Sequence, residues 1–284
     1  MLILAVVISA LVRDPAAARQ SAVATPVPAG TCRSVWPATP TATPNDAAVR
    51  TIQPTPTPFL DSEMRVDPLL APMVASAIAD LQACWNADDW AGVASLVTPR
   101  FLQTALGIDA AQGEERVREL AALALGPIEI EQVGPVGIWS DGRAAVDVVY
   151  RRGAGRPQQV VAARWFLIGA RGVAHIDEEV LLTPPLLGDR VTLGFSIPDD
   201  QQPLQWDSGG AGRVPVSPVI ALHGANRGLR PHTLLLESAD GARVSLLILP
   251  SWQQGDLILL NLPAGAYRLR DPAVSGSVLT LDVG

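Results

Sequence analysis

Residues 164–185 read RWFLIGARGVAHIDEEVLLTPP, and this stretch decides the architecture of the first half of the chain. Residues 159–168 and 173–182 are apolar-rich runs of strand length, and the glycine-bounded segment 169–172 separates them. This pattern predicts two antiparallel strands joined by a turn. The second strand is followed by two prolines, where we place the end of a first folded domain, residues 67–185.

Three more predicted strands precede this pair, and each ends at a turn. Residues 128–133 alternate apolar and acidic side chains, residues 136–139 meet a turn at 140–142, and residues 143–151 end at the hairpin tip 153–155. Consecutive strands with short turns predict an antiparallel meander.

Three predicted helices come before the meander. Apolar residues recur at helical spacing over residues 68–85. An aspartate at 88 or 89 is expected to cap a short helix at residues 90–97. Residues 114–125 begin with two acids, which suit a helix N-terminus. Helices followed by a meander predict an α+β domain.

Residues 186–284 show no helical periodicity and predict an all-β sandwich. Turns rich in Gly, Pro and Asp-Gly, such as Asp240–Gly241, separate short runs of strand-forming residues. The expected strands are residues 190–197, 219–225, 231–238, 243–249, 257–260, 265–269 and 276–283.

The N-terminal segment predicts export. Residues 2–12 are apolar but too few to cross a membrane comfortably, and Ala22-Val23-Ala24 offers a cleavage site, so residues 1–24 read as a signal peptide or a short membrane anchor. Residues 25–66 are rich in Pro and Thr and predict a disordered, extended linker. We therefore expect an extracytoplasmic protein, secreted or associated with the envelope.

Cysteine content leaves one pairing open. Cys32 lies in the linker and Cys84 in the first predicted helix, and an exported chain with two cysteines can form one disulfide. The sequence is equally compatible with two free thiols.

Composition excludes several classes of protein. The chain has 284 residues, of which 48% are apolar, so it is not wholly disordered. Two cysteines are too few for a disulfide scaffold. A net charge of -7 is too acidic for a general nucleic-acid binder.

The first domain resembles the nuclear transport factor 2-like superfamily, and specifically its SnoaL-like members. The resemblance rests on ACWNADDWAGVASLVTPRFL (83–102), DGRAAVDVVYRRG (141–153) and the stretch 164–185. It implies a cone-shaped fold in which helices and a curved antiparallel sheet enclose an apolar cavity. Members of the family include isomerases, cyclases, dehydratases and binding modules.

Candidate ligand-binding residues in such a cavity are Trp165, His175 and Asp177. His175, Asp177 and Glu179 alternate along one predicted strand and so are expected to share a face. A His can act as a general base when a neighbouring carboxylate orients its ring. Trp165 on the adjacent strand could form one side of a pocket for an apolar ligand. The alternative is that this face is the solvated side of the sheet.

Asp147 is a second candidate, because it interrupts an otherwise apolar strand. Arg143, Asp147 and Arg151 also make a reasonable outer face, paired across strands.

The second domain resembles the cupredoxins. The resemblance rests on VIALHGANRGLRPHTLLLE (219–237), with Asn226 and His232, and on the stretch PAGAY (263–267). A blue-copper site needs two His, a Cys thiolate and a weak axial ligand. Asp271 stands where the Cys is expected, and neither His nor Met follows His232. The resemblance therefore implies a cupredoxin-like domain without copper, and we expect no cofactor; a weak surface site of His223, His232 and Asp271 is the alternative.

Three functions remain open at this point. The first is an exported, non-catalytic two-domain module that binds a small apolar ligand, an envelope component or a protein partner, and that meets the membrane only through its N-terminal segment. The second is a small-molecule isomerase or cyclase that uses His175 and Asp177 as acid and base. The third, which the missing ligands disfavour, is a copper protein.

Overall fold

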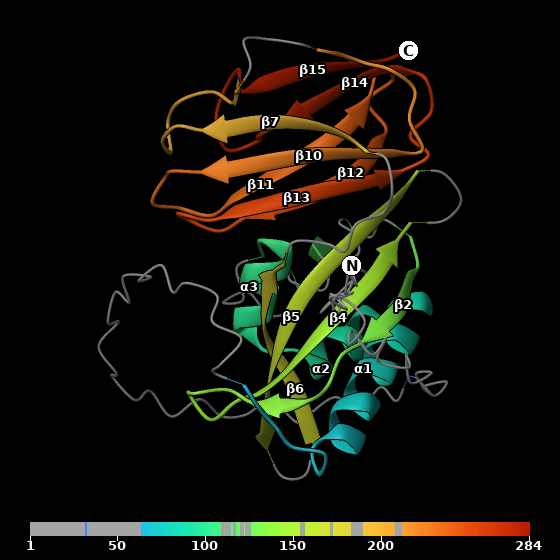
Figure 1. The fold of residues 1–284 in the computed structure, drawn as a ribbon, viewed down its shortest axis with the longest axis vertical. Coiled ribbons are helices and arrows are strands. Elements are labelled where there is room, and N and C mark those ends of the chain that lie inside the picture. The colour runs from blue at the N-terminus through green and yellow to red at the C-terminus, as the bar shows by residue number, and fades with distance from the viewer. Residues whose placement is uncertain are drawn as a thin grey trace, which may run out of the picture.

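The computed structural model shows a mostly β protein whose helices include α1, α2 and α3 (Figure 1). The structure describes Cys32 and residues 64–284, except for 109–114, 116–117, 120–121, 123–125, 154–156, 171–172, 183–189 and 208–211. The predicted signal or anchor, and all of the predicted linker except Cys32 and residues 64–66, lie outside the described residues. So does most of the predicted helix 114–125, whose four described residues, 115, 118, 119 and 122, are helical.

The helices belong to the first half of the chain. Helix α1 spans Ala71–Asn86, and α2 spans Trp90–Leu96 with Asp89 as its N-cap, since its carboxylate accepts a hydrogen bond from Gly92 N. Helix α3, Pro99–Leu106, was not expected. Thr98 caps it and Pro99 occupies its first turn, so Thr-Pro starts a helix here.

The strands of the first half follow the expected order. They are β1 (Arg65–Val66), β2 (Ile128–Val133), β3 (Gly137–Ile138), β4 (Ala144–Arg152), β5 (Gln158–Ala170) and β6 (Val173–Leu181). Strands β2, β4, β5 and β6 pair antiparallel, as the meander pattern predicted.

The second half is all β, as predicted. Its strands are β7 (Val191–Ile197), β8 (Gln205–Trp206), β9 (Arg213–Val214), β10 (Val219–Asn226), β11 (His232–Ser238), β12 (Arg243–Leu249), β13 (Gln254–Leu260), β14 (Gly265–Arg270) and β15 (Val278–Val283). One layer contains β13, β10, β7 and β8, and the other has the order β12-β11-β14-β15-β9. The two layers enclose a core of mostly aliphatic side chains, together with Phe195 and Tyr267.

A single sheet runs through both halves of the molecule. Strand β5 pairs antiparallel with β13, with Val160 opposite Ile258, so the sheet order is β1-β3-β4-β5-β13-β10-β7-β8. Figure 1 shows β5 rising from the helical half to the edge of the sandwich. The connection is reinforced by Gln159, whose Nε2 donates to Leu246 O and whose Oε1 accepts from Ser245 Oγ.

Strands β11 and β12 are buried on both faces. Leu247 and Leu249 of β12 point into the sandwich, whereas Leu246 and Ile248 belong to the core of the first half, together with Leu235 of β11. Strands covered on both sides contain unbroken apolar runs, which explains LLIL at 246–249. The sandwich therefore completes the core beneath the helices.

No helix among the described residues is long and apolar enough to cross a membrane.

Substituting Ile248→Ala tests this shared core. We expect the free energy of unfolding to fall by about 2–4 kcal/mol, because a buried side chain leaves a cavity. The described helices all lie in the other half, yet their unfolding midpoint should move to a lower urea concentration, because the two halves share this core. Far-UV circular dichroism during urea denaturation measures the midpoint. Val216→Ala, at an exposed position of the same half, is the control and should leave the midpoint unchanged.

Candidate functional site

Trp165 faces the interior of the first half. Its side chain is buried between the sheet and α3, where the ring meets Phe101 edge-on at 6.2 Å and tilts against Tyr150 at 5.7 Å. The indole Nε1 donates to Glu179 Oε2 at 2.8 Å. Trp165 is thus a buried residue of the core.

Asp177 and His175 do not join Trp165. Asp177 accepts hydrogen bonds from Thr98 Oγ1 at 2.9 Å and from Arg143 Nη1 at 3.0 Å, and the Arg143 guanidinium stacks over Phe166 on the outer face of the sheet. His175 is half-buried and lies opposite Ile168 in the register. Among the described residues, no hydrogen bond or ion pair connects His175 with Asp177, so the acid/base pair that the isomerase hypothesis requires is not assembled.

A β-bulge changes which residues of β6 face inward. Ile176 pairs with Leu167 and Glu178 pairs with Phe166, so Asp177 is an extra residue between them. Residues after the bulge therefore exchange faces. The expectation that Glu179 shares a face with His175 and Asp177 is wrong: Ile176 and Glu179 both point into the interior, and Val180 does not.

Glu179 is the centre of a buried polar cluster that the sequence did not reveal. Tyr150 OH donates to Glu179 Oε2 at 3.0 Å, beside the bond from Trp165, and Arg152 Nη2 donates to Tyr150 OH at 3.1 Å. Burial raises the pKa of the Glu179 carboxyl, while the bond from Trp165, the charge of Arg152 and the bond from Tyr150 oppose that rise. The cluster therefore holds a carboxyl whose protonated form is favoured by its surroundings.

The cluster forms the polar part of the lining of a small cavity between the two halves. Its volume is about 20 Å³, enough for a water or a very small ligand. Thr104, Tyr150, Arg152, Gln159 and Glu179 line it from the first half, and residues 246–248 and Pro250 close it from the second. The resemblance implied an apolar cavity beneath the helices; in the described structure, Leu246 and Ile248 pack into that core.

Asp147, the second candidate, forms an ion pair with Arg164. Arg164 Nε and Nη2 donate to its two carboxylate oxygens at 2.6 and 3.0 Å, and the Arg164 guanidinium stacks over Trp139. This cross-strand pair fits the outer-face interpretation.

His232 and Asp271 form a buried pair in the sandwich. Nδ1 of His232 lies 2.6 Å from Asp271 Oδ2, and both side chains are at most 3% exposed. Nε2 lies 3.4 Å from Asp200 Oδ1. The pair connects the start of β11 with the loop after β14.

These residues do not fit a blue-copper site. The chain has no Cys after Cys84 and no Met after Met73, so the thiolate and thioether are missing. His223 pairs with a different aspartate: its Nδ1 lies 2.6 Å from Oδ1 of Asp256 on the neighbouring strand. Within the described residues, the only group of three or more His, Cys, Asp or Glu ligand atoms close enough for one ion is Cys32, Cys84 and Asp89, outside the sandwich.

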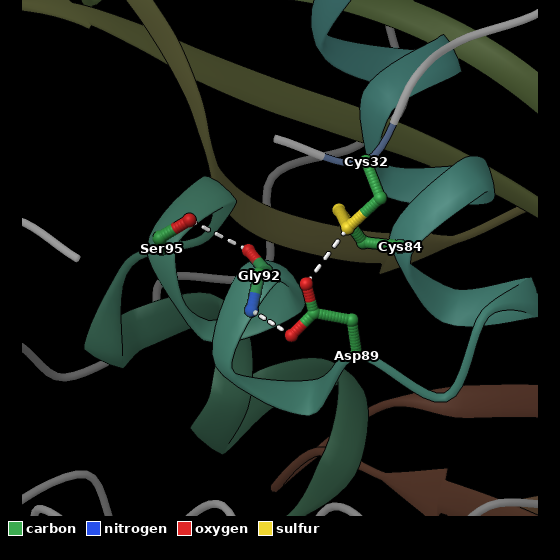
Figure 2. The surroundings of a disulfide bond; sticks show 5 residues. All are labelled: Cys32, Cys84, Asp89, Gly92 and Ser95. Atoms are coloured by element: carbon green, nitrogen blue, oxygen red, sulfur yellow. Dashed lines mark hydrogen bonds between the residues drawn. A yellow bond between two sulfur atoms is a disulfide. The ribbon is translucent and has the colours of Figure 1, made fainter. Parts of the chain in front are cut away.

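Cys32 and Cys84 form a disulfide, which answers the question that the sequence left open. Figure 2 shows it beside the start of α2, where Asp89 Oδ1 accepts from Gly92 N at 2.9 Å and Asp89 Oδ2 lies 2.9 Å from Cys32 Sγ. A disulfide sulfur has no hydrogen to donate, so this second approach is a close contact. A Cβ at Gly92 would lie 2.7 Å from Asp89 Oδ2 and 2.8 Å from Cys84 Sγ, which explains the glycine.

Two loops at one end of the sandwich, residues 226–231 and 250–253, form what we call the sandwich tip. Asn226 Nδ2 holds them together by donating to the carbonyls of Arg230, Leu249 and Pro250. Leu229 and Trp252 project from the tip with 76% and 58% of their surfaces exposed.

Comparison with known proteins finds likeness to solved structures at low sequence identity. No protein-family model and no curated protein matches the chain. Similar solved structures include a purple cupredoxin from Nitrosopumilus maritimus (17% identity, 32% of this chain and 98% of that one, TM-score 0.23) and auracyanin B (15% identity, 37% and 93%, TM-score 0.26). A blue copper oxidase from Nitrosomonas europaea is also similar (15% identity, 52% and 61%, TM-score 0.25), and the chain covers less than two thirds of its length.

The all-β sandwich rests on its own strand pairing, and the nuclear transport factor 2-like resemblance of the first half stays a prediction.

The Glu179→Gln variant tests the buried carboxyl. Because the folded-state pKa of Glu179 is raised, its contribution to stability is complete below the unfolded pKa of about 4.3 and is lost as the pH rises through the folded pKa. Gln cannot ionise, so the difference in unfolding free energy, variant minus wild type, should grow with pH and then level off. Urea denaturation across a pH series measures it, and a difference that shrinks with pH would contradict the assignment.

Reduction tests the disulfide. It closes a loop with a sequence separation of 52 residues, so its loss should lower the free energy of unfolding by about 2–4 kcal/mol. Thermal unfolding with and without a dithiol reductant measures the effect. The Cys32→Ser/Cys84→Ser variant is the control, because its melting temperature should not respond to reductant.

Proposed function

We propose that this protein is an exported, non-catalytic binding module whose sandwich tip attaches it to the surface of an envelope membrane. The observation that carries the proposal is Trp252, which is held exposed in a strained backbone conformation. The tip would be a second membrane contact in addition to the predicted N-terminal segment.

Trp252 occupies a position that favours a different residue. Gln253 N donates to Pro250 O, so residues 250–253 form a β-turn whose third residue, Trp252, has a φ of 57°. Turns of this kind prefer Gly or Asn there, and a bulky residue in this region costs on the order of 1 kcal/mol. A tryptophan that costs stability and remains exposed points to a role for its side chain in binding.

The chemistry of the tip suits a membrane interface. Trp is enriched at the boundary between hydrocarbon and water, and Leu229 adds a second exposed apolar side chain from the adjoining loop. Arg227 and Arg230 flank Leu229 and are exposed, so they can meet anionic headgroups. The bonds of Asn226 hold both loops in place before binding.

Two further features support export and a non-catalytic role. The Cys32–Cys84 disulfide is typical of oxidising compartments. The three residues proposed to form a ligand site lie on two faces of the sheet, and the sandwich sequence lacks the Cys and Met ligands of a blue-copper site.

Co-sedimentation with vesicles tests the proposal. The full chain should bind vesicles of phosphatidylglycerol and phosphatidylcholine, and Trp252→Gly should bind about tenfold more weakly while folding at least as stably, because Gly relieves the turn. Leu69→Ala, at a residue 86% exposed far from the tip in sequence, is the matched control and should bind like wild type. Absence of binding by the wild type, or equal binding by Trp252→Gly, would overturn the proposal.

A further inference from the structure

The side chain of Arg152 has an unused buried donor. Arg152 is 7% exposed and lines the cavity between the two halves, yet its Nε has no hydrogen-bond partner. Its guanidinium stacks over Trp85 at 5.5 Å and over Tyr150 at 5.6 Å, and Nη2 donates to the Tyr150 hydroxyl. A buried guanidinium N–H without a hydrogen-bond acceptor lowers the stability of the fold, and a bound ligand that accepts a hydrogen bond would remove this cost.

The Glu179 carboxyl presents a second donor when it is protonated. Tyr150 OH and Trp165 Nε1 both donate to Oε2, which therefore acts as the carbonyl oxygen. Oε1 receives no hydrogen bond from any described residue and is the oxygen left to carry the proton. Arg152 and Tyr150 are the charged and titratable groups that face Glu179 from β4; α3 and β5 contribute Thr104, Gln159 and Trp165, and β12 contributes apolar side chains.

Charge balance then selects the ligand. With Glu179 protonated, the cluster carries the single positive charge of Arg152, and one negative charge neutralises it. With Glu179 ionised, a bound anion would leave a net negative charge in a buried site, which is strongly unfavourable. The volume of about 20 Å³ admits a ligand only slightly larger than water.

We infer that the cavity between Arg152 and Glu179 is a binding site for a small monovalent anion, of the size of chloride or formate, which is taken up together with one proton. The anion accepts hydrogen bonds from Arg152 Nε and from the protonated Oε1 of Glu179. The raised pKa of Glu179 brings this protonation closer to neutral pH.

Thermal unfolding of the full chain with formate tests the site, with benzoate at equal ionic strength as a matched anion that is too large to enter. Formate should raise the melting temperature and benzoate should not. The apparent affinity for formate should fall about tenfold for each pH unit above the pKa of Glu179, because one proton is bound with the anion. Equal effects of the two anions, or no effect of formate at any pH, would overturn the inference.

Two variants assign the donors. Glu179→Gln keeps an N–H donor toward the cavity, so formate should still bind but with an affinity that no longer depends on pH. Arg152→Gln should lose the effect of formate, whereas Arg213→Gln, at an exposed arginine, should keep it. If Arg152→Gln keeps the effect of formate, the anion binds at another site and the inference is wrong. If that variant does not fold, the formate–benzoate comparison and the pH dependence of the wild type decide the question.

Discussion

Strand β12 is the element on which the rest of the molecule depends, because its two faces belong to two different cores. Leu247 and Leu249 fill the sandwich, while Leu246 and Ile248 lie under the helices of the first half. The β5–β13 pairing and the bonds of Gln159 keep the strand in this position. The side chains of Leu246 and Ile248 extend the apolar core beneath the helices. The same packing leaves a small polar cavity where the two halves meet.

One extra residue in β6 decides which chemistry faces that cavity. The bulge at Asp177 turns the acidic side chain of Glu179 inward and leaves Asp177 to Arg143 and Thr98 on the other side of the sheet. Tyr150, Trp165 and Arg152 already face inward from neighbouring strands, so the inverted glutamate meets hydrogen-bond donors and a positive charge. A polar cluster forms in an otherwise apolar interior as a result.

In the sandwich, a buried His–Asp pair links two segments that are far apart in the sequence. His232 and Asp271 are buried and hydrogen-bonded to each other, and they connect β11 with the loop after β14. Asn226 performs a similar function for the two loops of the sandwich tip. Side-chain bonds of this kind connect the loops from which Leu229 and Trp252 project.

The sequence by itself determined most of the secondary structure, including the strands of the sandwich, the meander and the aspartate cap of α2, because these follow from local periodicity, turn residues and capping. It also showed that the Cys and Met ligands of a blue-copper site are missing from the second half, since this is visible without coordinates. Only the tertiary structure decided which residues form the site. A bulge shifts the two-residue repeat of a strand and leaves no signal in the sequence. The apolar run at 246–249 indicates that both faces of β12 are covered, but it does not identify the residues that cover them. The contacts among Arg152, Tyr150 and Glu179, and the Cys32–Cys84 bond, depend on segments far apart in the chain, which local patterns cannot place.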